Sequence, residues 1–295
     1  MNGITIGNAR LFNDDCFDVL TKLDITADAV ISDPPYAAES FGGKCTDCDW
    51  DTPINLTDFW QLMESKAKPS ANIVLFGNLK FAFDLIGSNK KGFRYDMAWV
   101  KNHRVGFFNA NLMPLRAHEL VLVFGKPGFQ KTAVYNPLKT PSGRLRVNRV
   151  PTRKEGGVYP ATEAYTTISD GSVHPSSVLA FNHDRGNGSQ GLNWHPTQKP
   201  VSLMEWLIAT FTNEGDTVLD LFMGAGSTAV AARNLNRKFI GIEKELKYFD
   251  MAIERLKAPQ VNLFEDEVPY LFRSRQPDCR KAETKQENAF TGTGN

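Results

Sequence analysis

The residue types best suited to chemistry stand together in one run of four: Asp33, Pro34, Pro35 and Tyr36. The run follows apolar residues 29–31, which are typical of a buried strand. Because two prolines cannot continue a strand, the chain must turn there and leave these groups at the strand's carboxyl end, where open α/β sheets bind ligands. A carboxylate and a carbonyl can accept both N–H bonds of an amino group on a flat ring, while the tyrosine stacks on that ring. An ordinary turn after a strand is the alternative.

A second motif, residues 217–229, is an apolar strand that runs into a glycine-rich turn and an alanine-rich helix. Glycines let the backbone approach a ligand closely, and the helix N-terminus offers unpaired N–H groups. The next predicted strand ends in Glu243, a carboxylate that can accept hydrogen bonds from ribose hydroxyls. The spacing of Gly224, Gly226 and Ala229 also fits a dinucleotide fingerprint. These residues therefore indicate a nucleoside cofactor and leave its identity open.

The order of the two motifs along the chain indicates that residues 33–36 and residues 217–229 belong to the same sheet. Only 52 residues follow Glu243, and apart from a helical pattern at 245–256 much of that stretch is polar. A dinucleotide domain opening at residue 217 would need several more strands downstream. The other strands must therefore come from upstream, and a dehydrogenase is the least favoured reading. We expect residues 33–36 to lie beside the glycine turn, in the same sheet.

With both motifs in this order, the chain resembles the amino-group-specific DNA methyltransferases that use S-adenosylmethionine. It is similar to their beta subgroup, in which the catalytic motif precedes the cofactor motif, over about residues 8–258. Residues 33–36 match the catalytic motif, 220–226 the cofactor loop, and 195–200 the segment before that loop. Further similar segments are 13–16, 99–102 and 118–124. One departure is Asn13, where many relatives carry glycine.

This resemblance implies an α/β fold: a Rossmann-like S-adenosylmethionine-dependent methyltransferase sheet, circularly permuted, with an inserted target-recognition region. It implies a catalytic half at 1–125, the target-recognition region at 126–194 and a cofactor-binding half at 195–264. We expect the polar residues 265–295 to form a disordered tail.

The resemblance also implies a mechanism. Asp33 and the Pro34 carbonyl would accept the N–H bonds of the target amino group, so that its lone pair points at the sulfonium methyl group. The base would flip out of the duplex, and Tyr36 would replace its lost stacking. No nucleophilic cysteine is needed. Phe107 or Phe108 would pack in the core or fill the pocket.

Asp at the first motif position favours adenine N6 as the target in this family. Cytosine N4 is the alternative, RNA or protein amide substrates come third, and an inactive DNA-binding module of the same fold is a further alternative. The residues that the resemblance assigns to S-adenosylmethionine are Asp220, Phe222, Gly224, Gly226, Ser227, Thr228, Glu243, Lys199, Thr197, Asp15 and Cys16. Glu243 is assigned to the ribose, Lys199 and Thr197 to the methionine carboxylate, and Asp15 and Cys16 to the adenine end. Phe222 in the core and Lys199 on the surface are the structural alternatives.

Charge is unevenly distributed, although the net charge is only +1. Residues 13–64 hold twelve acidic and two basic residues, whereas residues 126–155 hold eight basic residues and one acid. Clustered basic side chains suit phosphates and guanine edges. A solvated charged loop is the alternative. We expect DNA contacts from Lys139, Arg144, Arg146, Arg149, Arg153 and Lys154.

The remaining features indicate where the protein works and with what. The 295 residues include no run long enough for a membrane helix and no visible signal peptide, so we expect a cytoplasmic protein. Expected partners are double-stranded DNA, a second copy of the chain in a homodimer, and a cognate restriction endonuclease. Cys45 and Cys48 form a single C-x-x-C pair, and without a second pair we expect no metal. The loop at 37–52 is a candidate flap over the base.

Periodicity and composition predict the elements that must position these residues. Helices are expected at 17–23, 56–67, 201–211, 228–235 and 245–256. Strands are expected at 29–32, 71–76, 97–100, 120–124, 217–221 and 239–243. The strands at 97–100 and 120–124 should form a hairpin-like unit, and residues 126–194 should be irregular.

Overall fold

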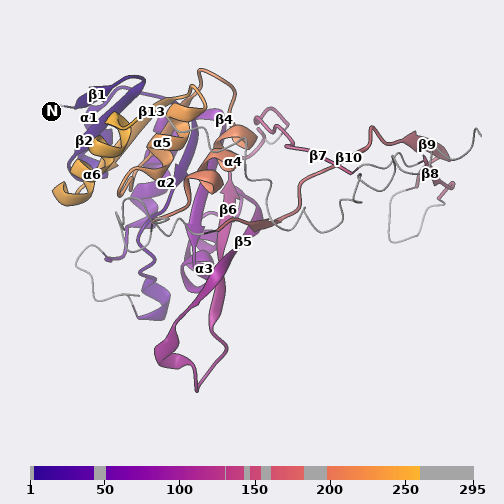
Figure 1. Ribbon diagram of the computed structural model, residues 1–295, viewed down its shortest axis with the longest axis horizontal. Helices are drawn as coiled ribbons and strands as arrows, with labels where there is room; N and C mark the ends of the chain where they lie inside the picture. The colour runs from indigo at the N-terminus through magenta and orange to yellow at the C-terminus, as the bar shows by residue number, and fades with distance from the viewer. Residues whose placement is uncertain are drawn as a thin grey trace, which may run out of the picture. The chain divides into compact units, whose positions relative to one another are not determined.

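The computed structural model describes residues 3–42, 51–129, 131–142, 147–153, 161–182 and 198–259 (Figure 1). Contacts divide the chain into two compact units. The first is built from Met1–Pro137 and Ser176–Glu267, and the second is described within Leu138–Pro175.

Within the described residues, nine strands of the first unit form one sheet. They are β1 Ile4–Ile6, β2 Ala9–Asn13, β3 Ala27–Ser32, β4 Ala67–Gly77, β5 Phe93–Val105, β6 Arg116–Phe124, β11 Val178–Ala180, β12 Thr217–Asp220 and β13 Lys238–Glu243. Their spatial order is β1-β2-β13-β12-β3-β4-β6-β5-β11. The central strands β2, β13, β12, β3 and β4 are parallel, and β6 runs antiparallel between β4 and β5. This is a mixed α/β fold with a large central sheet, as predicted.

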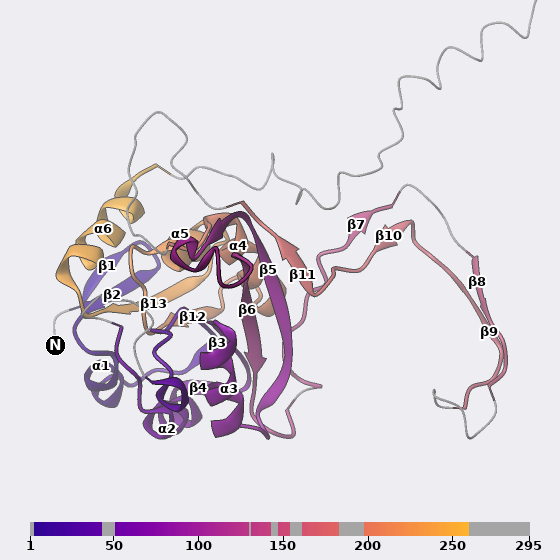
Figure 2. The same ribbon diagram turned by 90° about the horizontal axis from the view of Figure 1, so that it is seen from below.

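Helices cover both faces of the sheet (Figure 2). They are α1 Cys16–Lys22, α2 Leu56–Lys66, α3 Leu79–Ser88, α4 Val201–Phe211, α5 Ser227–Asn234 and α6 Leu246–Lys257. Successive strand residues point to opposite faces, so Ile31 packs with α4, α5 and α6 while Val30 packs with α1, α2 and α3. Among the helices in the described ranges, none combines the length and the apolar character needed to span a membrane.

Polar caps set where the helices around the site begin. Asp15 caps α1 by accepting a 3.0 Å hydrogen bond from the Phe17 amide, and Asn55 and Asn78 cap α2 and α3 in the same way. At α5 the cap is Gly226, whose φ of +78° is readily adopted only by glycine. The turns that precede these helices are therefore encoded locally, by residues that also lie near the sheet's carboxyl edge.

The two sequence motifs lie on neighbouring strands. β3 and β12 pair in parallel, with Ala29 opposite Val218 and Val30 opposite Leu219. Because the strands are parallel, residues 33–36 and the glycine turn leave the sheet at the same carboxyl edge. The prediction that the two motifs lie side by side in one sheet is confirmed. β3, from the N-terminal part of the chain, pairs with β12, from the C-terminal part.

The predicted helices and strands are confirmed, although β4 and β5 are longer than the predicted 71–76 and 97–100. β5 and β6 are antiparallel neighbours, as expected for a hairpin-like unit. The expectation for Phe107 and Phe108 is wrong, because their side chains are 71% and 103% exposed. They lie in a short 3-10 helix, η2 Phe107–Asn109, at the hairpin tip, and none of the three residues of this helix is buried in the part of the chain that the structure describes.

Residues 126–194 are less irregular than predicted. The second unit contains two antiparallel pairs: β7 Thr140–Pro141 with β10 Ser172–Val173, and β8 Val147–Val150 with β9 Tyr165–Ile168. β11, from the same region, joins the main sheet beside β5. These strands have two to four residues and mostly exposed side chains, so they carry no periodic apolar pattern. Residues 43–50 of the candidate flap, Cys45 and Cys48 among them, and the tail at 265–295 lie outside the described residues.

Candidate active site

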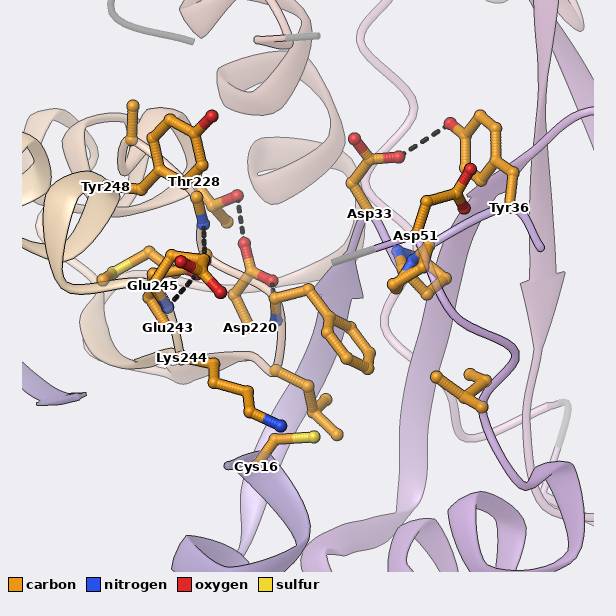
Figure 3. A pocket seen from close by; sticks show the side chains of 18 of the residues that line it. Cys16, Asp33, Tyr36, Asp51, Asp220, Thr228, Glu243, Lys244, Glu245 and Tyr248 are labelled. Carbon is orange, nitrogen blue, oxygen red and sulfur yellow. Dashed lines mark hydrogen bonds between the residues drawn. The ribbon is translucent and has the colours of Figure 1, made fainter. Parts of the chain in front are cut away.

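A cavity of about 470 Å³ lies at the carboxyl edge of β3 and β12 (Figure 3). Asp33, Tyr36 and Asp51 lie toward one side of it and Glu243 and Tyr248 toward the other, with Asp220 between them. The predicted site residues that line the cavity are Asp33, Pro34, Pro35, Tyr36, Asp220, Phe222, Gly224, Ser227, Thr228, Glu243, Lys199, Asp15 and Cys16. The fold therefore brings both motifs to one cavity. Thr197 lies outside the described residues.

Asp33 follows β3 directly, and both of its carboxylate oxygens have partners. Oδ1 accepts a 2.7 Å hydrogen bond from the Tyr36 hydroxyl, and Oδ2 pairs with the ammonium group of Lys199. The Lys199 side chain is only 6% exposed, and its Nζ also lies 3.4 Å from Oε2 of Glu119. A buried cation is thus shared between two carboxylates. The cofactor role expected of Lys199 stays a prediction, while in this structure its charge is directed at Asp33.

Glu119 and Lys101 complete this cluster. Glu119 lies on β6, where Oε2 is a second, longer acceptor for the one Tyr36 hydroxyl proton, 3.2 Å from the hydroxyl oxygen. Its Oε1 pairs with the ammonium group of Lys101 on β5. Neither residue is among those predicted for the site. The only signal in the sequence is that both lie in segments, 99–102 and 118–124, that resemble the family. Sheet pairing, rather than a local motif, brings them to the cavity.

Burial and the neighbouring charges set the protonation of the cluster. Burial alone would raise the pKa of Glu119, but Lys199 and Lys101 outweigh it and hold the pKa at about 2. Burial raises the pKa of Asp33, Lys199 opposes that rise, and Glu119 adds to it. Burial alone would lower the pKa of Lys199, but the two carboxylates raise it above its usual value. Glu119 and Lys199 are therefore charged at neutral pH, and the ionisation of Asp33 depends on the Lys199 ammonium group.

Asp220 fastens the glycine turn to the sheet. Its Oδ1 accepts from the Ser32 hydroxyl at 2.6 Å and from the Phe222 amide at 3.1 Å, and its Oδ2 accepts from the Thr228 hydroxyl at 2.6 Å. The residue is 2% exposed, and burial raises its pKa to about 6. One side chain thus joins β3, β12 and α5 beneath the cavity.

The two glycines of the turn have different surroundings. Both have positive φ, +54° at Gly224 and +78° at Gly226. A Cβ on Gly224 would meet no atom within 4 Å, whereas one on Gly226 would lie 2.7 Å from the Cβ of Ala252 in α6. Gly224 lines the cavity and Gly226 does not. Gly224 therefore leaves room at the cavity, and Gly226 permits close packing of α6 behind the turn.

Glu243 lies at the end of β13, opposite the catalytic motif. Its Oε2 accepts from the Gly224 amide and its Oε1 from the Glu245 amide, both at 2.8 Å. Burial raises its pKa. Each carboxylate oxygen can accept a second hydrogen bond, so the side chain can still bind a hydroxyl group of a ligand. Its assignment to the ribose stays a prediction.

Asp15 and Cys16 line the cavity beside Glu243. Asp15 caps α1, and the Lys244 ammonium lies 3.4 Å from its Oδ2. Burial, with a smaller contribution from Asp15, raises the pKa of the Cys16 thiol to about 12. The thiol is therefore protonated and is no nucleophile at neutral pH. In the described ranges, no group of three or more His, Cys, Asp or Glu side chains is arranged to hold a metal ion.

The basic residues expected to contact DNA belong to the second unit as far as they are described. Arg149 on β8 and Arg153 are exposed, and Lys139 pairs with Asp170 at 3.0 Å. Arg144, Arg146 and Lys154 lie outside the described residues. Exposed basic side chains suit a polyanion, and their role stays a prediction.

Two solved structures share this fold. The M1.HpyAVI–SAM complex has a TM-score of 0.57 and 24% sequence identity, covering 85% of this chain and 100% of that one. The PvuII DNA methyltransferase, described as cytosine-N4-specific, has a TM-score of 0.61 and 16% identity, covering 87% and 89%. At these identities the likeness concerns the fold alone, which is a Rossmann-like α/β sheet in all three proteins.

Sequence comparison identifies the family. Type II methyltransferase M.BglII from Bacillus subtilis is 28% identical over 262 residues, which are 84% of this chain and 68% of that protein. Type II methyltransferase M.HindIII from Haemophilus influenzae is 34% identical over 163 residues, covering 55% of this chain and 47% of that protein. The family model described as DNA methylase, N6_N4_Mtase, matches residues 27–254. The chain therefore belongs to the N6/N4 family of DNA methylases.

Proposed function

We propose that this protein transfers a methyl group from S-adenosylmethionine to the N6 amino group of an adenine flipped out of duplex DNA. The observation that carries this proposal is the position of Asp33. Its carboxylate lies in the same cavity as the glycine turn, directly after β3, the strand that pairs with β12. An acceptor for an amino group and a site for a nucleoside cofactor thus lie within one cavity.

The residues on the β12 side fit the cofactor. Gly224 leaves open space at the cavity, Glu243 offers carboxylate oxygens for hydroxyl groups, and Phe222 adds an aromatic face. S-adenosylmethionine, when bound, supplies an electrophilic methyl group on a sulfonium centre. The protein's part is to hold it with that methyl group toward Asp33, because alignment of donor and acceptor supplies much of the rate enhancement.

The residues on the β3 side fit the target. The lone pair of an exocyclic amino nitrogen is delocalised into the ring, so the nitrogen is a poor nucleophile. Hydrogen bonds from the amino group to Asp33 and to the Pro34 carbonyl favour a pyramidal nitrogen whose lone pair is free to attack. As the new N–C bond forms, the bond from the methyl group to sulfur would break and leave a neutral thioether, and the nitrogen would give up a proton that Asp33 is placed to accept. Tyr36 stacks on the base.

Lys199 influences the ionisation of Asp33 because its ammonium group pairs with the Asp33 carboxylate. A positive charge develops on the amino nitrogen as the methyl group transfers, and an ammonium group fully paired with Asp33 would oppose it. Glu119, 3.4 Å from Nζ of Lys199, offers the ammonium group a second partner. Lys199 thus opposes the rise in the pKa of Asp33 that burial causes, and Glu119 can take a larger share of the ammonium group as the target charge grows.

Adenine N6 is preferred over cytosine N4 because the first residue of the motif is Asp33, as in family members that mostly act on adenine. Cytosine N4 is the alternative, since it presents a similar amino group to the same acceptors. We assign the chain to the beta subgroup, with residues 126–194 for target recognition. A homodimer, a cognate restriction endonuclease and a cytoplasmic location complete the proposal.

The test is incubation of the purified protein with plain duplex DNA and labelled S-adenosylmethionine, followed by nucleoside analysis by mass spectrometry. N6-methyladenine is the expected product, and N4-methylcytosine would overturn the choice of base while keeping the chemistry. The Asp33→Ala variant should lose transfer and still bind S-adenosylmethionine. If the wild type binds the cofactor but forms no product, an inactive binding module or an RNA or protein substrate replaces the proposal.

A further inference from the structure

The hairpin of β5 and β6 carries an apolar tip that nothing in the described fold covers. Four large apolar side chains follow one another there within seven residues, each more than half exposed. They are Phe107 at 71%, Phe108 at 103%, Leu112 at 80% and Met113 at 57%. Figure 1 shows the hairpin, in magenta, extending past the helices. Scattered single apolar residues on a surface are ordinary, but a cluster of this kind marks a contact.

The tip projects from the edge of the sheet that holds the cavity. β4 ends at this edge with Gly77, which lies opposite Leu120 of the antiparallel β6. The part of β6 before Leu120, beginning at Arg116, therefore extends beyond the carboxyl end of β4. Glu119 of β6 and Lys101 of β5 belong to the charge cluster around Asp33. The hairpin thus rises from the active site itself.

The stem below the tip is basic. From residue 97 to residue 118 the chain has no Asp or Glu, and it contains Lys101, Arg104, Arg116 and two histidines. Arg104 and Arg116 are exposed. Basic side chains beside an apolar tip complement a polyanion with an apolar interior, which is the chemistry of a nucleic acid duplex: phosphates outside and stacked bases inside.

We propose that residues 106–115 form a wedge that enters the base stack of the substrate duplex beside the target base. The inference rests on the proposed function. Phe, Leu and Met are side-chain types that proteins insert between base steps. A flipped base leaves a gap and loses its stacking. The tip fills that gap while Arg104 and Arg116 contact the flanking phosphates, which stabilises the opened duplex next to Asp33.

The test compares two duplexes that carry a site mapped in DNA methylated by the wild type. In one the target base is paired, and in the other it faces an abasic position. The variant Phe107→Ser/Phe108→Ser should lose about ten- to hundredfold in kcat/KM on the paired duplex, given the usual contribution of stacking per base. It should recover most of that loss on the abasic duplex, where no pair has to be broken. Leu112→Ser/Met113→Ser should behave in the same direction.

The matched control is Ile4→Ser, because Ile4 is an exposed apolar residue on β1, at the opposite edge of the sheet. This variant should leave kcat/KM unchanged on both duplexes. Thermal unfolding and S-adenosylmethionine binding should match the wild type in all variants. An equal loss on both duplexes, or no loss, would overturn the wedge. If the tip variant sediments with a smaller mass than the wild type, the tip instead forms a contact between two copies of the chain. A wild type that methylates neither plain DNA nor the duplexes would overturn the proposed function as well.

Discussion

At the scale of single residues, the site is a chain of alternating charges. Lys101, Glu119, Lys199 and Asp33 follow one another with cation beside anion, and their side chains are at most about a quarter exposed. Charges withdrawn from water are tolerated only when they are paired, and removing one partner leaves the next uncompensated. The cluster thus links the acceptor of the proposed reaction to two strands that carry no catalytic motif.

Glu119→Gln tests this link. Glu119 raises the pKa of Asp33, so removing its charge should lower that pKa. If transfer needs ionised Asp33, the acid side of the pH–rate profile should move to lower pH in the variant. The profile of kcat, measured on duplex DNA between pH 5 and 9, checks this. Glu119→Asp, which keeps the charge, should leave the profile in place, and an unmoved profile in Glu119→Gln would show that Glu119 does not act on Asp33 through its charge.

Asp220→Asn tests the buried carboxyl group under the cavity. Burial raises its pKa from 3.8 to about 6, so its contribution to stability is full below pH 3.8 and is lost as the pH rises through 6. The free energy of unfolding of the wild type should therefore fall between pH 4 and 6 relative to the variant. The relative change should reach about 3 kcal/mol, since one pKa unit corresponds to 1.36 kcal/mol.

Urea denaturation of both proteins at pH 4, 5, 6 and 7 measures this difference. The comparison with Asp220→Asn removes the contributions of Asp33 and Glu243, which titrate in the same direction in both proteins. A constant difference across this range would mean that Asp220 ionises as it does in the unfolded chain.

The residue types of the two motifs were sufficient to predict most of the cavity wall, because each motif is local and lies at a strand end. Glu119 and Lys101 were not predictable in this way. They are separated from Asp33 by more than sixty residues and reach it only through the pairing of β4, β6 and β5. A lysine near a motif likewise does not reveal which carboxylate it will meet, and Lys199 pairs with Asp33 and Glu119.

At the scale of elements, the two glycines in the turn between β12 and α5 should differ in how much an alanine substitution lowers stability. Gly224→Ala places a methyl group in open space and should cost about 1–2 kcal/mol of stability, from the positive φ alone. Gly226→Ala also collides with Ala252 and should cost about 1–3 kcal/mol more. Denaturant unfolding measures both values.

The affinity for S-adenosylmethionine should distinguish the two variants in another way. Relative to the stability that each variant loses, Gly224→Ala should lose more affinity than Gly226→Ala. Gly224 lines the cavity, so its variant should weaken S-adenosylmethionine binding more than its modest loss of stability implies. Calorimetric titration measures the affinity. Equal stabilities for the two variants would contradict the role of Gly226 in packing α6 against the turn.

Element order was predictable for a physical reason. Each motif follows an apolar strand and supplies groups suited to one ligand site, so the two strands were expected in one sheet. β3 does pair with β12. The short strands β7 to β10 were not predictable. Their side chains are mostly exposed and their order comes from pairing between distant segments, which leaves no apolar period in the sequence.

At the scale of the whole molecule, the cavity and the basic residues predicted to contact DNA belong to different units. The cavity and the charge cluster belong to the first unit, whereas Lys139, Arg149 and Arg153 belong to the second. A net charge of +1 gives no general attraction to a polyanion, so affinity for DNA has to come from local clusters such as these. Salt dependence reports such contacts directly, because each neutralised phosphate releases counterions.

Arg149→Ala should therefore weaken binding to plain duplex DNA to a similar extent for all sequences if Arg149 contacts a phosphate. It should also lower the slope of log affinity against log salt by about 1. Lys238→Ala is the control, since Lys238 is exposed at the start of β13, at the edge of the sheet away from the cavity. Fluorescence anisotropy of a labelled duplex across a salt series measures both. An unchanged slope for Arg149→Ala would show that Arg149 on β8 contacts no phosphate. An equal fall in the slope for Lys238→Ala would lead to the same conclusion, because a specific phosphate contact is lost only when its own cation is removed.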